Sequence, residues 1–295
     1  MSLEVVRPGP LSLVQDAGRP GLAAIGVSPS GAFDRTALAR GATLVGNDPA
    51  LHAALEVTLG GLSVRAVVPV TMALTGAECP ATVDGRVVAW DRPLLLGAGE
   101  VLTLGLPRTG LRSYLSVGGG IDVPPVLGSR STDLLSGLGP PRLTAGMVLP
   151  VGEMFPEPDE GFPTVPGELA SAATERHEGP PPRQLDLLPG PRTDWLADPD
   201  ALATTWTVSP DSNRVGVRLT GTVLERSPSH LGAELPSEPL VRGAVQLPPS
   251  GQPVIFGPDH PTTGGYPVVA VLTEESSDRL AQCRPGDPVI LVWVA

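Results

Sequence analysis

Residues 237–269 read SEPLVRGAVQLPPSGQPVIFGPDHPTTGGYPVV, in which short apolar runs are separated by residues that favour turns. Proline presets φ and glycine supplies a positive φ, so tight turns are predicted at 248–251 and 263–265. Short apolar runs bounded by such turns are typical of β-strands. This part of the chain is therefore predicted to be a series of strands joined by tight turns.

The turns of this stretch also carry many hydrogen-bonding side chains. A glycine pair flanked by threonines and a tyrosine lets backbone N–H groups approach a ligand while the hydroxyls orient it. We therefore predict a ligand site here; a β-meander with ordinary polar loops is the alternative. The polar residues of the stretch are Glu238, Arg242, Gln246, Gln252, Asp259, His260, Thr262, Thr263 and Tyr266.

The same pattern extends over most of the 295 residues. Glycine and proline number 36 each, while hydrophobic residues make up 41% of the chain. Because the apolar residues form strand-like runs, the excess of glycine and proline indicates many turns rather than disorder. Gly60-Gly61 interrupts one such run, and Asp84-Gly85 is typical of a two-residue hairpin. These features predict a mainly β fold, arranged as a sandwich or barrel.

Residues 30–45 show the spacing of a helix, with Ser30 as the expected N-cap and Asp34 in the first turn. The predicted helix ends before Gly46. The apolar residues that recur at helical spacing are Phe33, Leu38, Ala42 and Val45.

Residues 155–183 contain seven prolines and six acidic residues, a composition typical of a solvated linker. Motifs from the start of the chain recur beyond it: Pro8-Gly9-Pro10 as Pro189-Gly190-Pro191, and Val27-Ser28-Pro29 as Val208-Ser209-Pro210. An internal duplication is therefore predicted, in which the second copy lacks the long helix. Its parts are an N-terminal β-barrel domain at 1–154, a linker at 155–183 and a C-terminal β-barrel domain at 184–295.

The net charge of −11 and the complete absence of lysine limit the possible chemistry. The chain has no Schiff-base lysine and no phosphate-gripping lysine of a P-loop. Its acidic balance argues against nucleic acid, whose phosphates require clustered basic residues. Two cysteines and four scattered histidines offer no metal-ligand spacing, so no metal site is predicted.

No apolar run reaches the roughly 18 residues of a membrane span, since Arg65 and Pro69 interrupt the longest candidate. Pro8-Gly9-Pro10 precedes any apolar segment that a secretory signal would need. We therefore expect no membrane association and a cytoplasmic location.

Three polar or glycine-rich loops each have two interpretations. Gln15, Asp16 and Arg19 suit a polar ligand or a partner surface, but Asp16 could instead bond its own backbone. Gly118-Gly119-Gly120 could cradle a phosphate or form a corner where two backbones approach closely. Residues 129–132 are rich in hydroxyls but lack His and Asp partners for a nucleophile.

Several motifs resemble the allophanate-hydrolase-subunit-2 family of biotin-dependent carboxyltransferase-like proteins. Members of this family include the C subunits of bacterial ATP-dependent 5-oxoprolinases, Kip A-type proteins and one half of the carboxyltransferase domain of urea carboxylases. The resemblance implies a pair of related cyclophilin-like β-barrel domains with one or two helices. It rests on VQDAGR at 14–19 with Gly21, YLSVGGGID at 114–122, LGSRST at 127–132, SNRVG at 212–216, and residues 237–269.

The oxoprolinase members imply an ATP-hydrolysing enzyme that acts on a cyclic amide. In this interpretation the chain works with 5-oxoprolinase subunits B and A to phosphorylate 5-oxoproline and open it to L-glutamate. ATP, with Mg²⁺, would act in the complex, and this chain would bind neither a metal nor biotin. Two alternatives remain: a carboxyltransferase component acting on urea or a similar amide with carboxybiotin, and a non-catalytic regulator that binds a partner.

Catalytic residues are not assigned from the sequence. Arginines must supply any phosphate or carboxylate clamp because lysine is absent, and Arg19, Arg214 and Arg242 are the candidates. His260 is a possible general base, although a lone loop histidine is more often solvated. The predicted substrate-binding residues are Asp16, Arg19, Asn213, Arg214, Glu238, Gln246, Asp259, Thr262, Thr263 and Tyr266.

Overall fold

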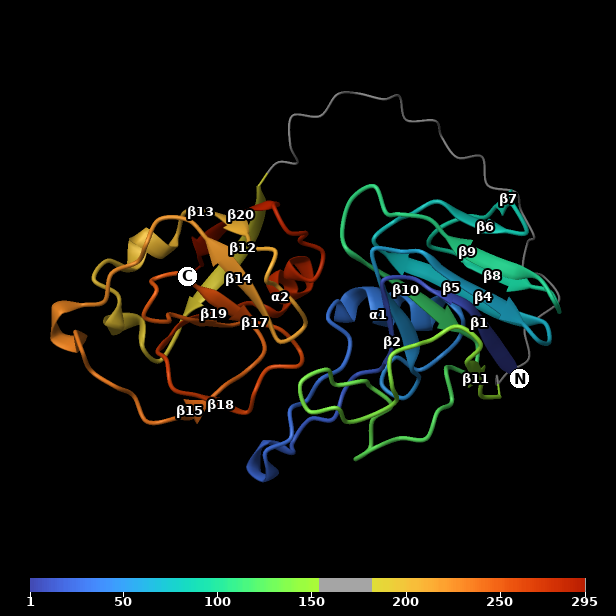
Figure 1. Cartoon of the computed structure of the whole chain (residues 1–295), viewed down its shortest axis with the longest axis horizontal. Helices are drawn as coiled ribbons and strands as arrows, with labels where there is room; N and C mark the ends of the chain where they lie inside the picture. The colour runs from blue at the N-terminus through green and yellow to red at the C-terminus, as the bar shows by residue number, and fades with distance from the viewer. Residues whose placement is uncertain (154–181, 295) are drawn as a thin grey trace, which may run out of the picture. The chain divides into compact units, whose positions relative to one another are not determined.

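The computed structural model describes residues 1–153 and 182–294 (Figure 1). Contacts between Cα atoms divide these residues into two compact units. The predicted linker at 155–183 lies almost wholly outside the described residues. The first unit comprises residues 1–19, 34–133 and 137–153, and the second comprises 20–33, 134–136 and 182–294.

The first unit contains two antiparallel sheets. One has the order β11 (Val148–Pro150), β1 (Ser2–Pro8), β4 (Leu62–Ala66), β9 (Val101–Leu104), β6 (Ala81–Val83) and β7 (Arg86–Val87). The other has the order β2 (Leu11–Gln15), β3 (Ala54–Thr58), β10 (Arg112–Val117), β5 (Val70–Gly76) and β8 (Pro93–Leu96).

Turn chemistry positions these strands. Asp84 and Gly85 both have positive φ, 47° and 81°, and they connect β6 to β7 as the sequence predicted. Such a two-residue turn matches the twist of an antiparallel pair. At Gly119 an added Cβ would lie 2.2 Å from the carbonyl oxygen of Gly152. The glycine run therefore forms a corner where two backbones meet, which is the second of its two interpretations.

Helix α1 (Arg35–Leu44) packs on β5 and β10, so β10 is buried along its whole length (Figure 1). Gly41 permits this packing, because an added Cβ would lie 2.5 Å from Ser116 Oγ. Asp34 is the N-cap and accepts a hydrogen bond from Ala37 N at 2.8 Å. The predicted start at Ser30 is therefore wrong.

Ser30 and Phe33 belong to the second unit instead of the helix. Ser30 has a φ of 51°, in the left-handed region, and its hydroxyl donates to Asp259 Oδ1 at 2.7 Å. Phe33 is fully buried in the hydrophobic core of the second unit. Both residues are thus held by contacts to distant parts of the chain, which helical spacing cannot reveal.

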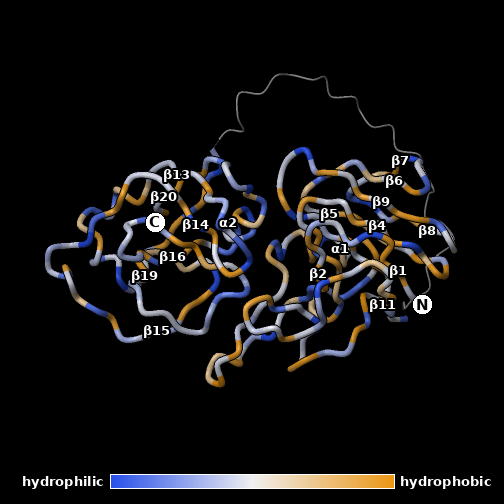
Figure 2. Tube along the Cα trace, in the orientation of Figure 1, coloured by the Kyte–Doolittle hydropathy of each residue, from blue (hydrophilic) through white to orange (hydrophobic). Residues whose placement is uncertain are grey.

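The second unit is a closed seven-stranded barrel in which β12 (Arg183–Pro189) and β20 (Pro288–Trp293) form the parallel pair. The hydrophobic stretches of its strands are visible in Figure 2. A further two-stranded sheet pairs β15 (Glu238–Pro239) with β18 (Thr263–Gly264). The barrel order is β12 (Arg183–Pro189), β19 (Val268–Leu272), β16 (Ala244–Gln246), β17 (Val254–Phe256), β14 (Gly216–Thr220), β13 (Thr205–Val208) and β20 (Pro288–Trp293).

Helix α2 (Glu274–Leu280) follows β19 and is capped by Thr273, which accepts a hydrogen bond from Ser276 N. With α1 it makes two α-helices among the described residues, so the predicted mainly β fold with one or two helices is confirmed. Four short 3₁₀ helices complete the described structure: Ala23–Ile25, Thr193–Trp195, Pro199–Leu202 and Pro228–His230. Within the described ranges, no helix is long and apolar enough to cross a membrane.

Candidate functional site

Asp16 is buried in the first unit, and its carboxylate is fully occupied by the protein. It accepts hydrogen bonds from Ser129 Oγ and Arg130 N, each at 2.6 Å, and from Gly18 N at 2.8 Å. Ser131 Oγ donates to the same carboxylate. The three bonds from Ser129, Arg130 and Ser131 tie the 14–19 motif to the 127–132 motif, which favours a structural role for Asp16.

Arg19 lies beside this network and is also buried. Its guanidinium donates to the backbone carbonyls of Val126, at 3.3 Å, and Ser131. The two predicted residues of this loop thus join two segments of the first unit.

Arg214 and Asp259 form a buried ion pair in the second unit, with side chains 1% and 0% exposed. The pair is bidentate, with Nε to Oδ2 at 2.9 Å and Nη2 to Oδ1 at 3.0 Å. Asp259 also accepts from Ser30 Oγ and from Leu134 N, while Arg214 donates to Gly31 O at 2.6 Å. This geometry joins segments 28–31 and 134–136 to the barrel.

Three other predicted residues also bond within the second unit. Asn213 is exposed, and its Oδ1 accepts from Val215 N at 2.8 Å in an Asx-type turn. Glu238 pairs with Arg192, whose hydrogen bond lowers the pKa of the Glu238 carboxyl. Arg242, the third candidate clamp, pairs with Asp278.

The Thr-Thr-Gly-Gly-Tyr loop is held by backbone pairing and by Gln246. Leu240 N donates to Thr262 O at 3.0 Å, and the buried Gln246 Nε2 donates to Tyr266 O at 2.9 Å. Thr263 is exposed and Tyr266 is 46% exposed, so these two side chains are accessible.

The expected positive φ at this glycine pair is wrong, since neither Gly264 nor Gly265 lies in the left-handed region. Close packing favours a glycine at 264 instead, since any larger residue would have to displace two neighbouring side chains. An added Cβ there would lie 2.8 Å from Gln246 Nε2 and 2.9 Å from Leu240 Cδ1. At Gly265 the nearest atom would be 3.8 Å away.

His260 is buried, at 3% exposure, which contradicts the expectation of a solvated loop histidine. Its Nδ1 lies 2.8 Å from Pro261 O, and its ring meets the Phe256 ring edge-on at 6.5 Å between centroids. In the part of the chain that the structure describes, no group of three or more His, Cys, Asp or Glu residues could hold a metal ion.

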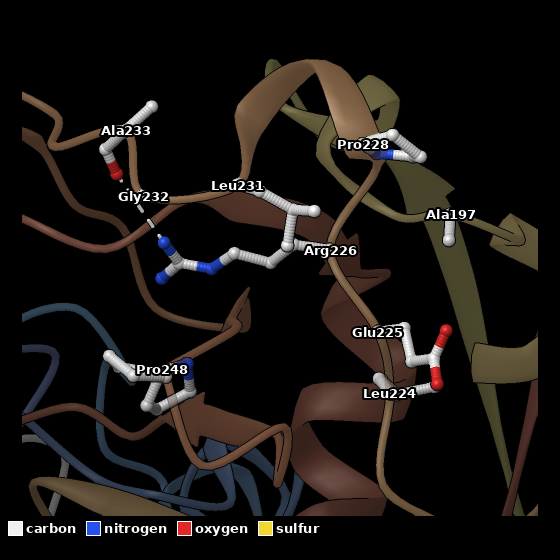
Figure 3. A pocket seen from close by; sticks show the side chains of 10 residues that line it. Ala197, Leu224, Glu225, Arg226, Pro228, Leu231, Gly232, Ala233 and Pro248 are labelled. Atoms are coloured by element: carbon white, nitrogen blue, oxygen red, sulfur yellow. Dashed lines mark hydrogen bonds between the residues drawn. The ribbon is translucent and has the colours of Figure 1, made fainter.

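Two pockets of the second unit meet at Arg226. The larger, of about 600 Å³, is shown in Figure 3, where the Arg226 side chain extends toward Ala233 O. The smaller, of about 250 Å³, includes Tyr266 from the predicted set. The larger is lined by Ala197, Leu224, Glu225, Arg226, Pro228, Leu231, Gly232, Ala233, Pro248 and Pro249. The smaller is lined by Trp195, Arg226, Ala233, Glu234, Leu235, Pro249, Gly265, Tyr266 and Pro267.

Arg226 is held by a cation–π contact and by two long hydrogen bonds. Its guanidinium carbon lies 5.5 Å from the Trp195 ring centroid, and Trp195 in turn stacks on His230 at 4.4 Å and 20°. Its bonds to the carbonyls of Ala233 and Leu247, at 3.5 and 3.4 Å, are long and therefore weak. Among the described residues it forms no salt bridge, and its buried Nε has no hydrogen-bond partner.

An arginine fixed in place beside two pockets, with its charge not neutralised by a carboxylate, can bind an anionic ligand. Sequence reasoning missed Arg226, Trp195 and His230. No local signal identifies them, because Trp195 is distant in the sequence from Arg226 and His230 and only the fold brings it to them.

Comparison with known proteins agrees with this architecture. The sequence model of the family described as "Carboxyltransferase domain, subdomain A and B" matches residues 25–293. The chain is 40% identical to the 5-oxoprolinase C subunit of Escherichia coli (strain K12), covering 98% of this chain and 90% of the relative. It is 31% identical to the 5-oxoprolinase C subunit of Haemophilus influenzae, over 94% and 86%.

A solved structure, the K. lactis urea amidolyase, is also similar, with a TM-score of 0.86 and 29% identity. The similarity covers 100% of this chain and 19% of that chain. The protein thus spans about a fifth of the urea amidolyase polypeptide.

Proposed function

The chain belongs to the family of carboxyltransferase domains with subdomains A and B, and from this premise we propose that it is the C subunit of a 5-oxoprolinase. In this role it acts with partner subunits B and A in the ATP-dependent opening of 5-oxoproline to L-glutamate.

The observation that carries this proposal is the end-to-end match with two 5-oxoprolinase C subunits. The match covers 90% and 86% of those relatives, so the whole chain corresponds to nearly the whole of each relative. The urea amidolyase, in contrast, contains this chain as a small part of a long polypeptide. The higher identity to a 5-oxoprolinase C subunit, 40% against 29% for the urea amidolyase, therefore favours the oxoprolinase role.

The reaction has a clear chemical requirement. An amide carbonyl is a poor electrophile, and transfer of a phosphoryl group to its oxygen turns that oxygen into a leaving group. Water can then add to the carbon, and the ring nitrogen leaves as a protonated amine, which breaks the C–N bond and opens the ring. The resulting acyl phosphate is hydrolysed by a second water to the carboxylate and inorganic phosphate. What this chain's own residues offer is the binding of a small polar molecule at the pockets beside Arg226.

The described residues do not fit a triphosphate. The chain has no lysine, and Gly119 is packed against the backbone of Gly152. Arg19 is engaged with backbone carbonyls, while Arg214 and Arg242 are paired with carboxylates. We therefore assign no phosphoryl-transfer step to this chain.

The test is reconstitution of the complex. The purified chain is expected to show no 5-oxoproline-dependent ATP hydrolysis, and addition of subunits B and A should restore it. Turnover by the single chain, or an inactive complex of three folded subunits, would contradict the proposal.

A carboxyltransferase acting on urea is the second candidate, and the similarity to the urea amidolyase structure favours it. The chain has no lysine to carry biotin, so carboxybiotin would have to come from another protein. Carboxylation of urea by the chain in the presence of a carboxybiotinylated carrier protein would support this alternative.

A further inference from the structure

Arg226 differs from the other arginines that the sequence or the structure singles out in the second unit. Arg192, Arg214 and Arg242 each pair with a carboxylate of the same unit. Arg226 has no such partner among the described residues, although Glu225 and Glu234 line the pockets beside it. The Arg226 guanidinium therefore lines both pockets without forming an ion pair to a carboxylate of the described residues.

The position of this charge is well defined. The cation–π contact with Trp195, which is itself stacked on His230, holds the guanidinium beside the ring without using its N–H donors. The contacts to the two backbone carbonyls are long enough to be exchanged for a stronger acceptor. An entering carboxylate would gain charge-assisted hydrogen bonds from an arginine that is already oriented.

The smaller pocket offers a complementary group for each part of a small lactam acid. Arg226 can donate to a carboxylate, the Tyr266 hydroxyl to a ring carbonyl, and Glu234 can accept from a ring N–H. The remaining lining, Leu235 and Pro249 among it, is apolar and suits the methylene groups of a ring.

The charged side chains of the smaller pocket also favour a singly charged anion over a multiply charged one. Among the residues that line the smaller pocket, Arg226 is the one cationic side chain, and Glu234 repels a multiply charged anion more strongly than a monoanion. Nucleotide phosphates are bound by several cations or by a cradle of backbone N–H groups. The composition therefore favours a monoanion with an apolar body.

We propose that this pocket binds a small cyclic amide bearing one carboxylate, and that Arg226, stacked on Trp195, holds the carboxylate. The inference deepens the proposed function and rests on it, since 5-oxoproline is such a compound.

The experiment measures equilibrium binding of 5-oxoproline to the full chain and to the reconstituted complex. Arg226→Met should weaken binding about 10- to 100-fold, the loss expected for a charge-assisted pair. Arg226→Lys should recover part of it, because the charge returns without the planar fork. The matched control is Arg218→Met, an exposed arginine of β14 that lines neither pocket, and it should bind as the wild type does.

Two further ligands identify what Arg226 recognises. The same lactam without its carboxylate, 2-pyrrolidinone, should bind weakly and equally to wild type and Arg226→Met. Inorganic phosphate should not compete with 5-oxoproline. Competition by phosphate that disappears in Arg226→Met would overturn the lactam assignment in favour of a phosphate site.

Thermal melting shows whether Arg226→Met is folded. A second variant, Tyr266→Phe, tests the pocket even if Arg226→Met does not fold. Tyr266→Phe removes one hydroxyl from a half-exposed side chain and should weaken 5-oxoproline binding about fivefold or more with an unchanged melting temperature. Wild-type affinity in both variants would refute the inference. If the wild-type complex hydrolyses ATP in the presence of 5-oxoproline but Arg226→Met binds 5-oxoproline as tightly as wild type, only the pocket assignment is refuted. If the wild-type complex is inactive, the proposed function is refuted as well.

Discussion

We expect Asp259→Asn to destabilise the second unit strongly while leaving its ligand affinity largely intact. The substitution keeps the size of the side chain, so no cavity forms. The carboxylate accepts from two nitrogens of Arg214, from Ser30 Oγ and from Leu134 N. In asparagine an NH₂ group replaces one carboxylate oxygen. At least one of the protein donors that now bonds to that oxygen would then face another N–H donor and lose its hydrogen bond. Arg214, 1% exposed, would then retain a charge without its counter-ion.

Removing one partner of a buried ion pair typically costs about 3–5 kcal/mol. The assay is urea unfolding followed by far-ultraviolet circular dichroism, from which the free energy of unfolding is obtained. Asp211→Asn, at an exposed aspartate of the same unit, is the matched control and should change that free energy by less than about 0.5 kcal/mol.

The same variant separates a structural role from a binding role. A double-mutant cycle with Arg214→Met should show the double variant to be less destabilised than the sum of the single variants, because the uncompensated charge is gone. If Asp259→Asn lost less than about 1 kcal/mol of stability but lost 5-oxoproline binding, the carboxylate would be a ligand group and the anchoring argument would be refuted.

Three further predictions test local features. Gly264→Ala should cost about 1–3 kcal/mol of stability because its Cβ meets the Gln246 and Leu240 side chains, whereas Gly265→Ala should stay within about 0.5 kcal/mol; equal losses would contradict the packing. Burial raises the pKa of Cys79 to about 11, so thiol labelling at neutral pH should need unfolding, and fast labelling of the native protein would oppose this. The Arg192 hydrogen bond lowers the pKa of Glu238, so the pair should stabilise the folded protein relative to the Glu238→Gln variant. This stabilisation should be complete above the unfolded pKa of about 4.3 and should disappear as pH falls through the lower folded pKa. A difference in stability between wild type and variant that does not change with pH would contradict this prediction.

The strands and hairpins could be predicted because their signals are local. Asp84-Gly85 specifies its turn through the φ values that two adjacent residues can adopt, and the turn forms as expected. The start of α1 could not be placed in this way, since Ser30 and Asp34 are equally good N-caps. The choice depends on the hydrogen bond from Ser30 to Asp259, which no local pattern contains.

The candidate site was harder to predict for a related reason. Sequence identifies residues with unusual hydrogen-bonding capacity, but not whether that capacity is used by a ligand or by the protein itself. Arg214 and Asp259 turn out to satisfy each other, and Gln246 holds a backbone carbonyl. Arg226 has ordinary neighbours in the sequence, and its importance comes from stacking on Trp195.

Two buried carboxylates, Asp16 and Asp259, explain why several of the sequence motifs stabilise the fold and do not line the pockets. Asp16 in the first unit and Asp259 in the second each accept four protein hydrogen bonds, and each joins chain segments that are distant in sequence. A polar group that is fully satisfied inside the fold cannot be exchanged without a large loss of stability. Such groups therefore constrain the architecture more tightly than they constrain the ligand. The pocket lining at 226–235 carries fewer of these constraints, since Glu234 is exposed and Arg226 forms no salt bridge among the described residues, and the backbone around the short 3₁₀ helix Pro228–His230 lies in loops. Among chains that share this fold, differences in the molecule bound are thus expected at the loop that carries Arg226 and Glu234, and not at the motifs.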